Sequence, residues 1–367
     1  MHARSGLGDD GMSPVVVETD SHQLRVVPVV RGLERPWSVA VLPDGDILVT
    51  ERPGRLRLIR QGVLDPEPIA GLPSVDAREH GGLLEVTPHV NFTQTRWLYL
   101  SYTKGGPQGV TLALARGRLV DHQLHDVTDI FVADAWHTTT VHFGGRLAVG
   151  LDGSVFMAIG DRDQRHRAQS LSDHAGTVVR LTEDGGVPAD NPFVSRPGAR
   201  PEIFSYGHRN PQGLAFDRAT GTLWEHEHGP QGGDELNRLR PGTNYGWPLV
   251  TYGREYTGAL IAEQPWQPGM EQPVLFWSPS IGISGMTFYT GDTFYGWTTG
   301  LFVGGLVGQQ LQRIAFSDEG PVQRESMLRT FGYRIRDVRE SRDGFLYVVT
   351  DGEEGALLRL EPASPAS

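Results

Sequence analysis

His142 and Asp161 are the residues of this sequence best placed to move a proton. They flank two apolar runs, 147–149 and 155–159, which are joined by the turn Asp152-Gly153. In an antiparallel hairpin the start of the first strand lies beside the end of the second, so the carboxylate should reach the imidazole. A histidine oriented in this way can act as a general base toward a hydroxyl group. A structural histidine that only bonds a neighbouring loop is the alternative.

Three arginines, Arg209, Arg334 and Arg336, stand near the starts of other predicted strands. At a shared opening their guanidinium groups would repel one another unless an anion lay between them. Their fork geometry suits a planar polycarboxylate. The alternative is ordinary ion pairing on the surface, with Asp337 and Glu202 as partners.

The segment 225–235 combines four carboxylates with glycines that expose the main chain. Carboxylates and free carbonyls around a Gly-Pro step suit a hard cation, so we expect calcium here. Zinc bound by His226 and His228 is a second possibility, but no third ligand stands at a recognisable spacing.

The composition narrows the partners of this chain. Its 367 residues include 33 Lys and Arg against 44 Asp and Glu, a formal net charge of −11. Nucleic acid and anionic membranes require a positive patch, so neither is expected as a partner. No apolar run approaches the ~18 residues that span a bilayer, so membrane insertion is not expected. The lack of cysteine excludes thiolate catalysis and disulfides.

The elements that must position these residues are predicted to be strands. Helical periodicity is absent, whereas apolar runs flank Asp-Gly turns, which we expect to be type I′ hairpins. Such hairpins recur in six units, which begin near Pro36, Gly81, Gly144, Asn210, Gly282 and Arg334. We predict an all-β fold, a single six-bladed β-propeller of four-stranded antiparallel blades. An immunoglobulin-like tandem or a jelly roll is the alternative.

The predicted propeller covers residues 21–361. Residues 1–20 are expected to be a flexible amino-terminal segment and residues 362–367 a short tail. No signal peptide can be read from the amino-terminal residues.

Longer motifs resemble the soluble aldose sugar dehydrogenases, a family similar to soluble quinoprotein glucose dehydrogenase. The similarity runs from about Pro28 to Leu360. The motifs that carry it are Pro36–Val41, Gly81–Leu84, His142–Leu147, Ile159–Arg162, Gly176–Leu181, Pro188–Phe193, Gly207–Gly213, Glu227–Asn237, Asn244–Pro248 and Arg334–Val338. The resemblance implies a six-bladed propeller that uses pyrroloquinoline quinone (PQQ) and calcium to oxidise aldoses to lactones.

The resemblance also assigns roles to individual residues. His142 would take the proton of the sugar's anomeric hydroxyl while a hydride passes from C1 to the quinone, and Asp161 would orient it. Arg209, counted among the catalytic residues, and Asn210 would contact the quinone oxygens. The cofactor's carboxylates would be held by Arg334 and Arg336.

Two calcium sites are implied as well. The main-chain carbonyls of Gly229 and Pro230 would bind the calcium that also contacts the quinone, and Glu235 and Tyr245 would belong to a second, structural calcium. The electron acceptor would be a small molecule or a protein, the chain would be a monomer or dimer, and its location would be periplasmic or secreted.

The sequence departs from the family pattern at four positions. His80, a candidate substrate contact, stands where glutamine is common. His228, a candidate cofactor contact, replaces a glutamine of the glucose enzyme, Val307 replaces a lysine, and Val141 replaces an acid. A sugar- or protein-binding propeller without catalysis and a calcium-dependent lactonase are the other functions considered.

Overall fold

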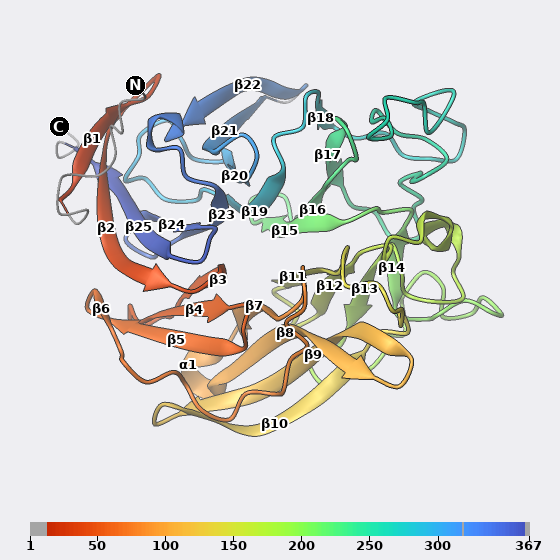
Figure 1. The fold of residues 1–367 in the computed structure, drawn as a ribbon, viewed down its shortest axis with the longest axis horizontal. Coiled ribbons are helices and arrows are strands. Elements are labelled where there is room, and N and C mark those ends of the chain that lie inside the picture. The colour runs from red at the N-terminus through yellow and green to blue at the C-terminus, as the bar shows by residue number, and fades with distance from the viewer. Residues whose placement is uncertain (1–12, 318, 364–367) are drawn as a thin grey trace.

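Six antiparallel β-sheets surround a common axis in the computed structural model, which describes residues 13–317 and 319–363 (Figure 1). The first three sheets contain β3 (Pro36–Val41), β4 (Ile47–Glu51), β5 (Arg55–Arg60), β6 (Val63–Leu64); β7 (Leu83–Pro88), β8 (Trp97–Gly106), β9 (Gly109–Val120), β10 (Gln123–Val132); and β11 (Gly144–Val149), β12 (Val155–Ile159), β13 (Thr177–Leu181), β14 (Ile203–Tyr206). The last three contain β15 (Pro211–Asp217), β16 (Thr222–Glu227), β17 (Asp234–Arg238), β18 (Leu275–Trp277); β19 (Ile283–Phe288), β20 (Leu301–Gly305), β21 (Gln310–Ser317), β22 (Gly320–Met327); and β23 (Ile335–Glu340), β24 (Leu346–Thr350), β25 (Gly355–Pro362), β2 (Gln23–Leu33), β1 (Val15–Glu18).

This arrangement confirms the six-bladed propeller and excludes both alternative folds. The innermost strands β3, β7, β11, β15, β19 and β23 contact one another in sequence, and β23 returns to β3. Their starts lie within two residues of the six predicted unit starts. Helix is confined, in the described residues, to α1 (Phe92–Thr95) and the 3-10 turns η1 (Arg165–Gln169) and η2 (Arg329–Phe331). None of these described helices is long and apolar enough to cross a membrane.

The ring closes because the two ends of the chain share the sixth sheet. β2 pairs with β25, and β1 adds a fifth strand at the outer edge of that sheet. β1 lies inside the segment 1–20 for which flexibility was predicted, so part of that segment is paired strand. Residues 1–12 of that segment, and residues 364–367 of the predicted tail 362–367, lie outside the described residues.

The Asp-Gly hairpins are present, but their predicted turn type is wrong. A type I′ turn needs positive φ at both central residues. At Asp44-Gly45, Asp152-Gly153 and Asp343-Gly344 only the glycine has positive φ, at +90°, +83° and +77°. The loops are longer than two residues, since β3 ends at Val41 and β4 begins at Ile47. A longer hairpin loop built on an ordinary turn needs one left-handed residue, which glycine supplies.

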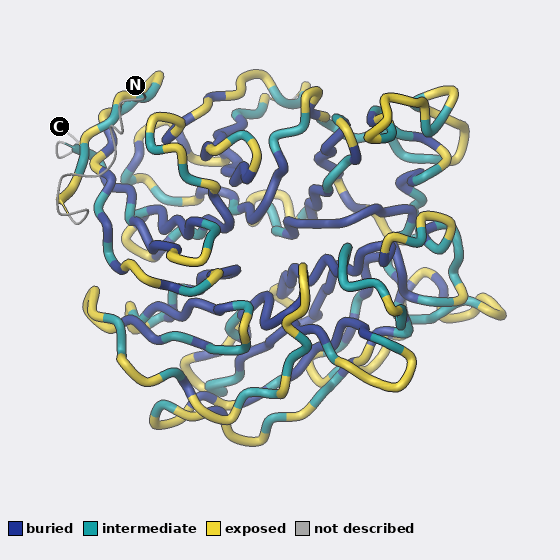
Figure 2. Tube along the Cα trace, in the orientation of Figure 1, coloured by how far each residue is buried: buried dark blue, intermediate teal, exposed yellow. Residues whose placement is uncertain are grey.

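The hydrophobic core lies between neighbouring blades. One buried cluster, for example, packs Tyr99 and Leu112 of the second blade against Leu147 and Met157 of the third. Buried backbone is concentrated in the strands, whereas exposed backbone follows the outer loops (Figure 2). Because apolar side chains hold each blade against its neighbours, the inner strand starts are fixed around the channel.

Candidate active site

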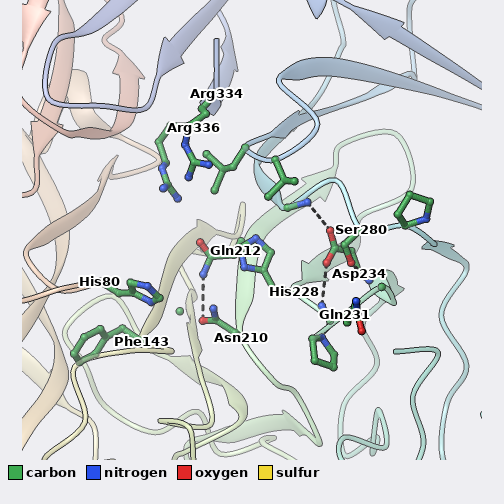
Figure 3. A pocket seen from close by; sticks show the side chains of 18 of the residues that line it. His80, Phe143, Asn210, Gln212, His228, Gln231, Asp234, Ser280, Arg334 and Arg336 are labelled. Carbon is green, nitrogen blue, oxygen red and sulfur yellow. Dashed lines mark hydrogen bonds between the residues drawn. The ribbon is translucent and has the colours of Figure 1, made fainter. Parts of the chain in front are cut away.

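The starts of the inner strands surround a cavity of about 550 Å³. Eight residues that the sequence singled out line it: His80, Asn210, His228, Gly229, Pro230, Val307, Arg334 and Arg336. In Figure 3, Arg334 and Arg336 lie together on one side of the cavity, and His80, Asn210 and His228 lie around the rest. Residues separated by up to 256 positions in sequence therefore meet at one opening, as a ring of blades requires.

Positive charge exceeds negative charge on the arginine side of this cavity. Nε of Arg334 lies 2.8 Å from Asp351 Oδ2, and Nη2 of Arg336 lies 3.0 Å from Asp351 Oδ1. Arg334 and Arg336 therefore do not pair with Asp337 or Glu202, the partners considered from sequence. They share the carboxylate of Asp351. Burial would raise the pKa of Asp351, but Arg336 and Arg334 outweigh it and lower that pKa. Burial in turn lowers the pKa of Arg336.

A third arginine of this wall, Arg52, was not singled out from sequence. It lines the cavity directly after β4, and its Nε donates to the carbonyl of Gly81 at 3.1 Å. Its Nη2 is buried without a hydrogen-bond partner among the described residues. Burial lowers the pKa of Arg52, and the charge of Arg336 lowers it further. Its position after the second strand of a blade, like that of Asp161, could have identified it.

Below the cavity, four charges, three of them buried and that of Arg339 partly exposed, are matched against each other. Arg146 Nη1 lies 2.8 Å from Glu85 and 3.1 Å from Asp337. Arg339 contacts the same two carboxylates, each at 2.9 Å. The guanidinium of Arg146 also lies 3.9 Å from the ring centre of Trp37, a cavity-lining residue. This neutral charge cluster of two arginines and two acids joins the second, third and sixth blades at the axis.

The contact expected between His142 and Asp161 is present. Nδ1 of His142 lies 2.8 Å from Oδ1 of Asp161, because Gly144 at the start of β11 pairs with Ile159 at the end of β12. Asp161 is buried and also accepts hydrogen bonds from the indole of Trp247 at 2.8 Å and the backbone N–H of Asp163 at 2.8 Å. Both of those groups can only donate. The carboxylate is therefore the acceptor, Nδ1–H of His142 donates, and Nε2 is left as a proton acceptor.

His142 itself is not a lining residue but stands beside the cavity, since Phe143 and Gly144, which follow it in sequence, both line it. Within residues 13–317 and 319–363, Nε2 of His142 has no hydrogen-bond partner. The loop that carries it is fixed by the guanidinium of Arg162, which lies 3.7 Å from the ring centre of Phe143 and donates to the carbonyls of Val141 and Thr139. Trp247 and Arg162 are supporting residues that sequence reasoning missed.

Arg209 does not converge with the other two arginines on the cavity. Its guanidinium donates to the carbonyls of His228 and Gly229, both at 3.1 Å, and it lines a separate cavity of about 10 Å³. The expectation that three guanidinium groups share one opening is therefore wrong for Arg209. The carbonyl of Gly229, a candidate calcium ligand, already accepts one hydrogen bond, which leaves its second lone pair.

His228 lines the cavity as a neutral imidazole. Its Nε2 lies 2.5 Å from the carbonyl of Ile283, and burial lowers its pKa to about 4. Asp234 also lines the cavity, but its carboxylate accepts hydrogen bonds from the backbone N–H groups of Gly229, Gly282 and Ile283. Asp234 therefore shapes the loop around Gly229 and Pro230.

A buried cluster of carboxylates lies behind this loop. Ligand atoms of His208, Glu225 and Glu227 all lie within 4.8 Å of one another. Glu235, a candidate ligand of the second calcium, pairs across the strands with Glu227. Burial raises the pKa of Glu225 and of Glu235, and the charge of Glu227 raises both further. Oε1 of Glu225 is buried without a hydrogen-bond partner among the described residues.

Tyr245 contacts this cluster through its ring, which stacks on His208 at 4.9 Å. Its phenol donates to the carbonyl of Arg238 at 2.6 Å and accepts from the backbone N–H of Arg240 at 3.0 Å. The phenol thus already donates one hydrogen bond and accepts another. His226, the other half of the zinc possibility, is buried on the opposite side of β16 from Glu225 and Glu227.

Comparison with known proteins identifies the family. Residues 33–359 match the family described as Glucose / Sorbosone dehydrogenase, and the chain belongs to this family. It is 43% identical over 337 residues to aldose sugar dehydrogenase YliI of Escherichia coli, which covers 90% of this chain and 91% of that protein. The resemblance stated from sequence is confirmed.

Solved structures agree with this assignment. A crystal structure of glucose dehydrogenase superposes with a TM-score of 0.90 at 47% identity, over 92% of this chain and 99% of that chain. The PQQ-bound form of an aldose sugar dehydrogenase from Streptomyces coelicolor superposes with a TM-score of 0.76 at 26% identity, over 95% of this chain and 98% of that chain.

Proposed function

We propose that this chain is a quinoprotein dehydrogenase that oxidises the C1 hydroxyl of aldoses to lactones with PQQ and calcium. The observation that carries the proposal is a cavity that holds an excess of arginine beside an oriented histidine. The named activities of the relatives support sugar oxidation as the reaction class. The name of the Streptomyces coelicolor structure supports PQQ as the cofactor.

The cavity wall fits a flat polycarboxylate. Arg52, Arg334 and Arg336 line it, while a single carboxylate, Asp351, pairs with two of them. Nη2 of Arg52, which has no hydrogen-bond partner among the described residues, offers a further donor. Arg334, Arg336 and Arg52 would hold the carboxylates of the cofactor, and Asn210 would contact the quinone. Arg209 would act on the cofactor by fixing the carbonyls of His228 and Gly229.

The chain's own residues provide for the proton. Oxidation of C1 removes two electrons and two protons from the hydroxyl carbon and its oxygen. When bound, PQQ supplies the acceptor for the hydride that leaves C1. Nε2 of His142 accepts the hydroxyl proton, and Asp161 holds Nδ1–H and stabilises the imidazolium that forms. His80, at the exposed rim of the cavity, would contact the sugar.

Two places fit calcium. Gly229 and Pro230 line the cavity, and a divalent cation held by their carbonyls would polarise a bound carbonyl group. The acids Glu225, Glu227 and Glu235 are buried close together, and a structural cation would offset their negative charge. The main-chain carbonyl of Tyr245 would complete this second site. The electron acceptor is proposed to be a small molecule or a protein, and the location periplasmic or secreted.

Reconstitution tests the proposal. The purified chain is incubated with calcium and PQQ, then glucose or another aldose is added with a redox dye, and the dye's absorbance is followed. We expect reduction of the dye that requires the quinone, the cation and the sugar together. Dye reduction without added quinone, or lactone hydrolysis without dye reduction, would assign the chain to another class. Sugar binding without either reaction would indicate a binding propeller.

A further inference from the structure

One aromatic ring in the cavity of the candidate active site is open to a ligand. Among the described residues, three Trp, Phe or Tyr residues line this cavity: Trp37, Phe143 and Tyr256. Trp37 and Phe143 are 4% and 2% exposed, so protein already covers their rings, whereas Tyr256 is 75% exposed. The phenol of Tyr256 has no hydrogen-bond partner in the described part of the chain. A large exposed ring inside a cavity is stabilised when a ligand covers it.

Tyr256 lies in a tight turn whose backbone is fixed. In this turn the N–H of Gly258 donates to the carbonyl of Glu255 at 2.7 Å, and Gly258 has a φ of +87°, which favours glycine. Just before the turn, Arg254 and Gln231 exchange two backbone hydrogen bonds, both of 3.0 Å. Gln231 is itself a lining residue. The turn therefore holds Tyr256 at the edge of the cavity, so that little ordering of the main chain opposes the binding of a ligand.

An ion pair ties the same turn to the loop of Asp161. Nη1 of Arg165 lies 2.7 Å from Oε1 of Glu255, and Arg165 begins η1, which follows Asp161 in sequence. The guanidinium of Arg165 also lies 5.7 Å from the ring centre of Trp247, whose indole donates to Asp161. A continuous series of contacts thus connects the turn to the carboxylate that orients the proposed base. Tyr256 therefore borders the part of the cavity where the proton would be accepted.

This part of the cavity is separate from the arginine wall. In Figure 3, Gln231, the backbone partner of the turn, lies across the cavity from Arg334 and Arg336. A polycarboxylate held by those arginines would leave the side of Tyr256 for the second reactant. That reactant must present a hydroxyl group, because Nε2 of His142 is the proton acceptor beside it.

The ring of Tyr256 matches the surface of a sugar. A pyranose has faces of C–H groups, whose hydrogens are slightly positive, and hydroxyl groups around its edge. The face of an aromatic ring is negatively polarised, so it attracts such a C–H face, and the phenol at its end can bond a hydroxyl group. Because neither interaction involves a net charge, this surface suits an uncharged ring better than an anion.

We propose that Tyr256 is a substrate-binding residue on which the pyranose ring of the aldose packs, with its C1 hydroxyl directed to His142. This inference rests on the proposed function, since it takes sugar oxidation as the reaction. The sugar makes the contact equally before and during hydride transfer, so the contact should lower KM and contribute little to kcat.

The test compares Tyr256→Ala, Tyr256→Phe and the wild type after reconstitution with calcium and PQQ. Dye reduction at varied glucose concentrations gives KM and kcat. Binding of 1,5-anhydroglucitol, which has no C1 hydroxyl to oxidise, is followed by NMR titration of the same proteins. We expect Tyr256→Ala to raise KM and the dissociation constant of 1,5-anhydroglucitol about 10-fold, with kcat within ~3-fold of the wild type. Tyr256→Phe keeps the ring and should stay within ~3-fold of the wild type throughout.

The matched control is Tyr295→Ala, because Tyr295 is 86% exposed but does not line the cavity. This variant should match the wild type in every measurement. The proposal is wrong if the wild type does not bind 1,5-anhydroglucitol saturably, or if Tyr256→Ala keeps the wild-type KM and affinity. It is also wrong if Tyr256→Phe loses as much as Tyr256→Ala, or if Tyr256→Ala mainly loses affinity for PQQ. Binding of 1,5-anhydroglucitol that depends on Tyr256, without any dye reduction by the wild type, would count against the proposed function alone.

Discussion

Two neighbouring regions of this molecule contain buried or partly buried arginines, but only one of them contains an equal number of carboxylates. In the central charge cluster, Arg146 and Arg339 are matched by Glu85 and Asp337, and the four side chains satisfy one another. In the cavity wall above it, three arginines face one carboxylate, Asp351. A matched cluster needs nothing further, whereas an unmatched wall is complementary to an anion. The balance of charge, more than the presence of arginine, therefore separates structural from ligand-binding positions.

Breaking the matched cluster should have the largest effect. Arg146→Met leaves two buried carboxylates with one arginine, and an unpaired buried charge costs about 3–5 kcal/mol. We expect the free energy of unfolding, measured by chemical denaturation, to fall by that amount. Arg196→Met, at an exposed site, should change it by less than ~0.5 kcal/mol. A loss below ~1 kcal/mol at Arg146 would remove the distinction between the two regions.

The histidine beside the unmatched wall should matter for turnover and little for binding. His142→Ala removes the proton acceptor, and general base catalysis contributes a factor of about 100 or more. We expect turnover of the reconstituted enzyme with an aldose to fall by at least that factor, while the affinity for PQQ measured by fluorescence is kept. His125→Ala, which removes an exposed histidine of β10, is the control and should be neutral. Unchanged turnover in His142→Ala would remove this residue from the mechanism.

Removing an arginine from the unmatched wall should weaken the binding of PQQ more than it destabilises the protein, the opposite of what we expect for the matched cluster. Arg52→Gln removes an Nη2 that has no partner among the described residues and one hydrogen bond, from Nε to the carbonyl of Gly81, so the stability of the free protein should fall by no more than ~1 kcal/mol. The affinity for PQQ should fall about 10-fold, because one charge-assisted contact is lost. Calorimetry measures both quantities. A destabilised protein with unchanged quinone affinity would show that Arg52 is structural.

The effect of a buried histidine near the axis should be confined to acidic pH, where it is visible as a pH dependence of stability. Burial lowers the pKa of His226 well below its ordinary value of 6.5. As pH falls below 6.5, the unfolded chain binds a proton that the folded chain does not, so stability falls with pH and is unaffected well above it. One such group contributes up to ~1.4 kcal/mol per pH unit. In His226→Leu, the slope of the free energy of unfolding against pH should be smaller between pH 6.5 and 5. The difference should correspond to about one proton fewer taken up on unfolding, and denaturation at several pH values measures it. An identical slope would contradict this.

The fold could be predicted from sequence because each blade carries the same local signals. Asp-Gly steps between apolar runs repeat along the chain, and some inner strands begin at a proline or glycine, as at Pro36 and Gly144. The contact between His142 and Asp161 followed from one hairpin. We predicted the wrong turn type because residues 44–46 belong to a loop longer than two residues. The hydrogen bonds inside this loop depend on the distance that it spans between β3 and β4, which the sequence does not show.

The cavity was harder to predict because it forms between blades. Arg52 follows a strand that looks like any other, and only its position beside Arg336 shows that it faces the same opening. Arg209 was expected there, but the direction of its side chain depends on the carbonyls of His228 and Gly229 in the next hairpin. Partners that are distant in sequence decide both positions. The assigned chemical roles of His142, Asp161, Glu235 and Tyr245 stay predictions.

A titration of PQQ into the purified protein in the presence of calcium tests the central claim most directly. It is followed by calorimetry for the wild type and for the Arg334→Gln/Arg336→Gln double variant. The account predicts saturable binding of one quinone per chain to the wild type and an affinity at least ~100-fold lower in the variant, because two charge-assisted contacts are lost. Equal affinities for the two proteins, or no saturable binding to the wild type, would contradict it.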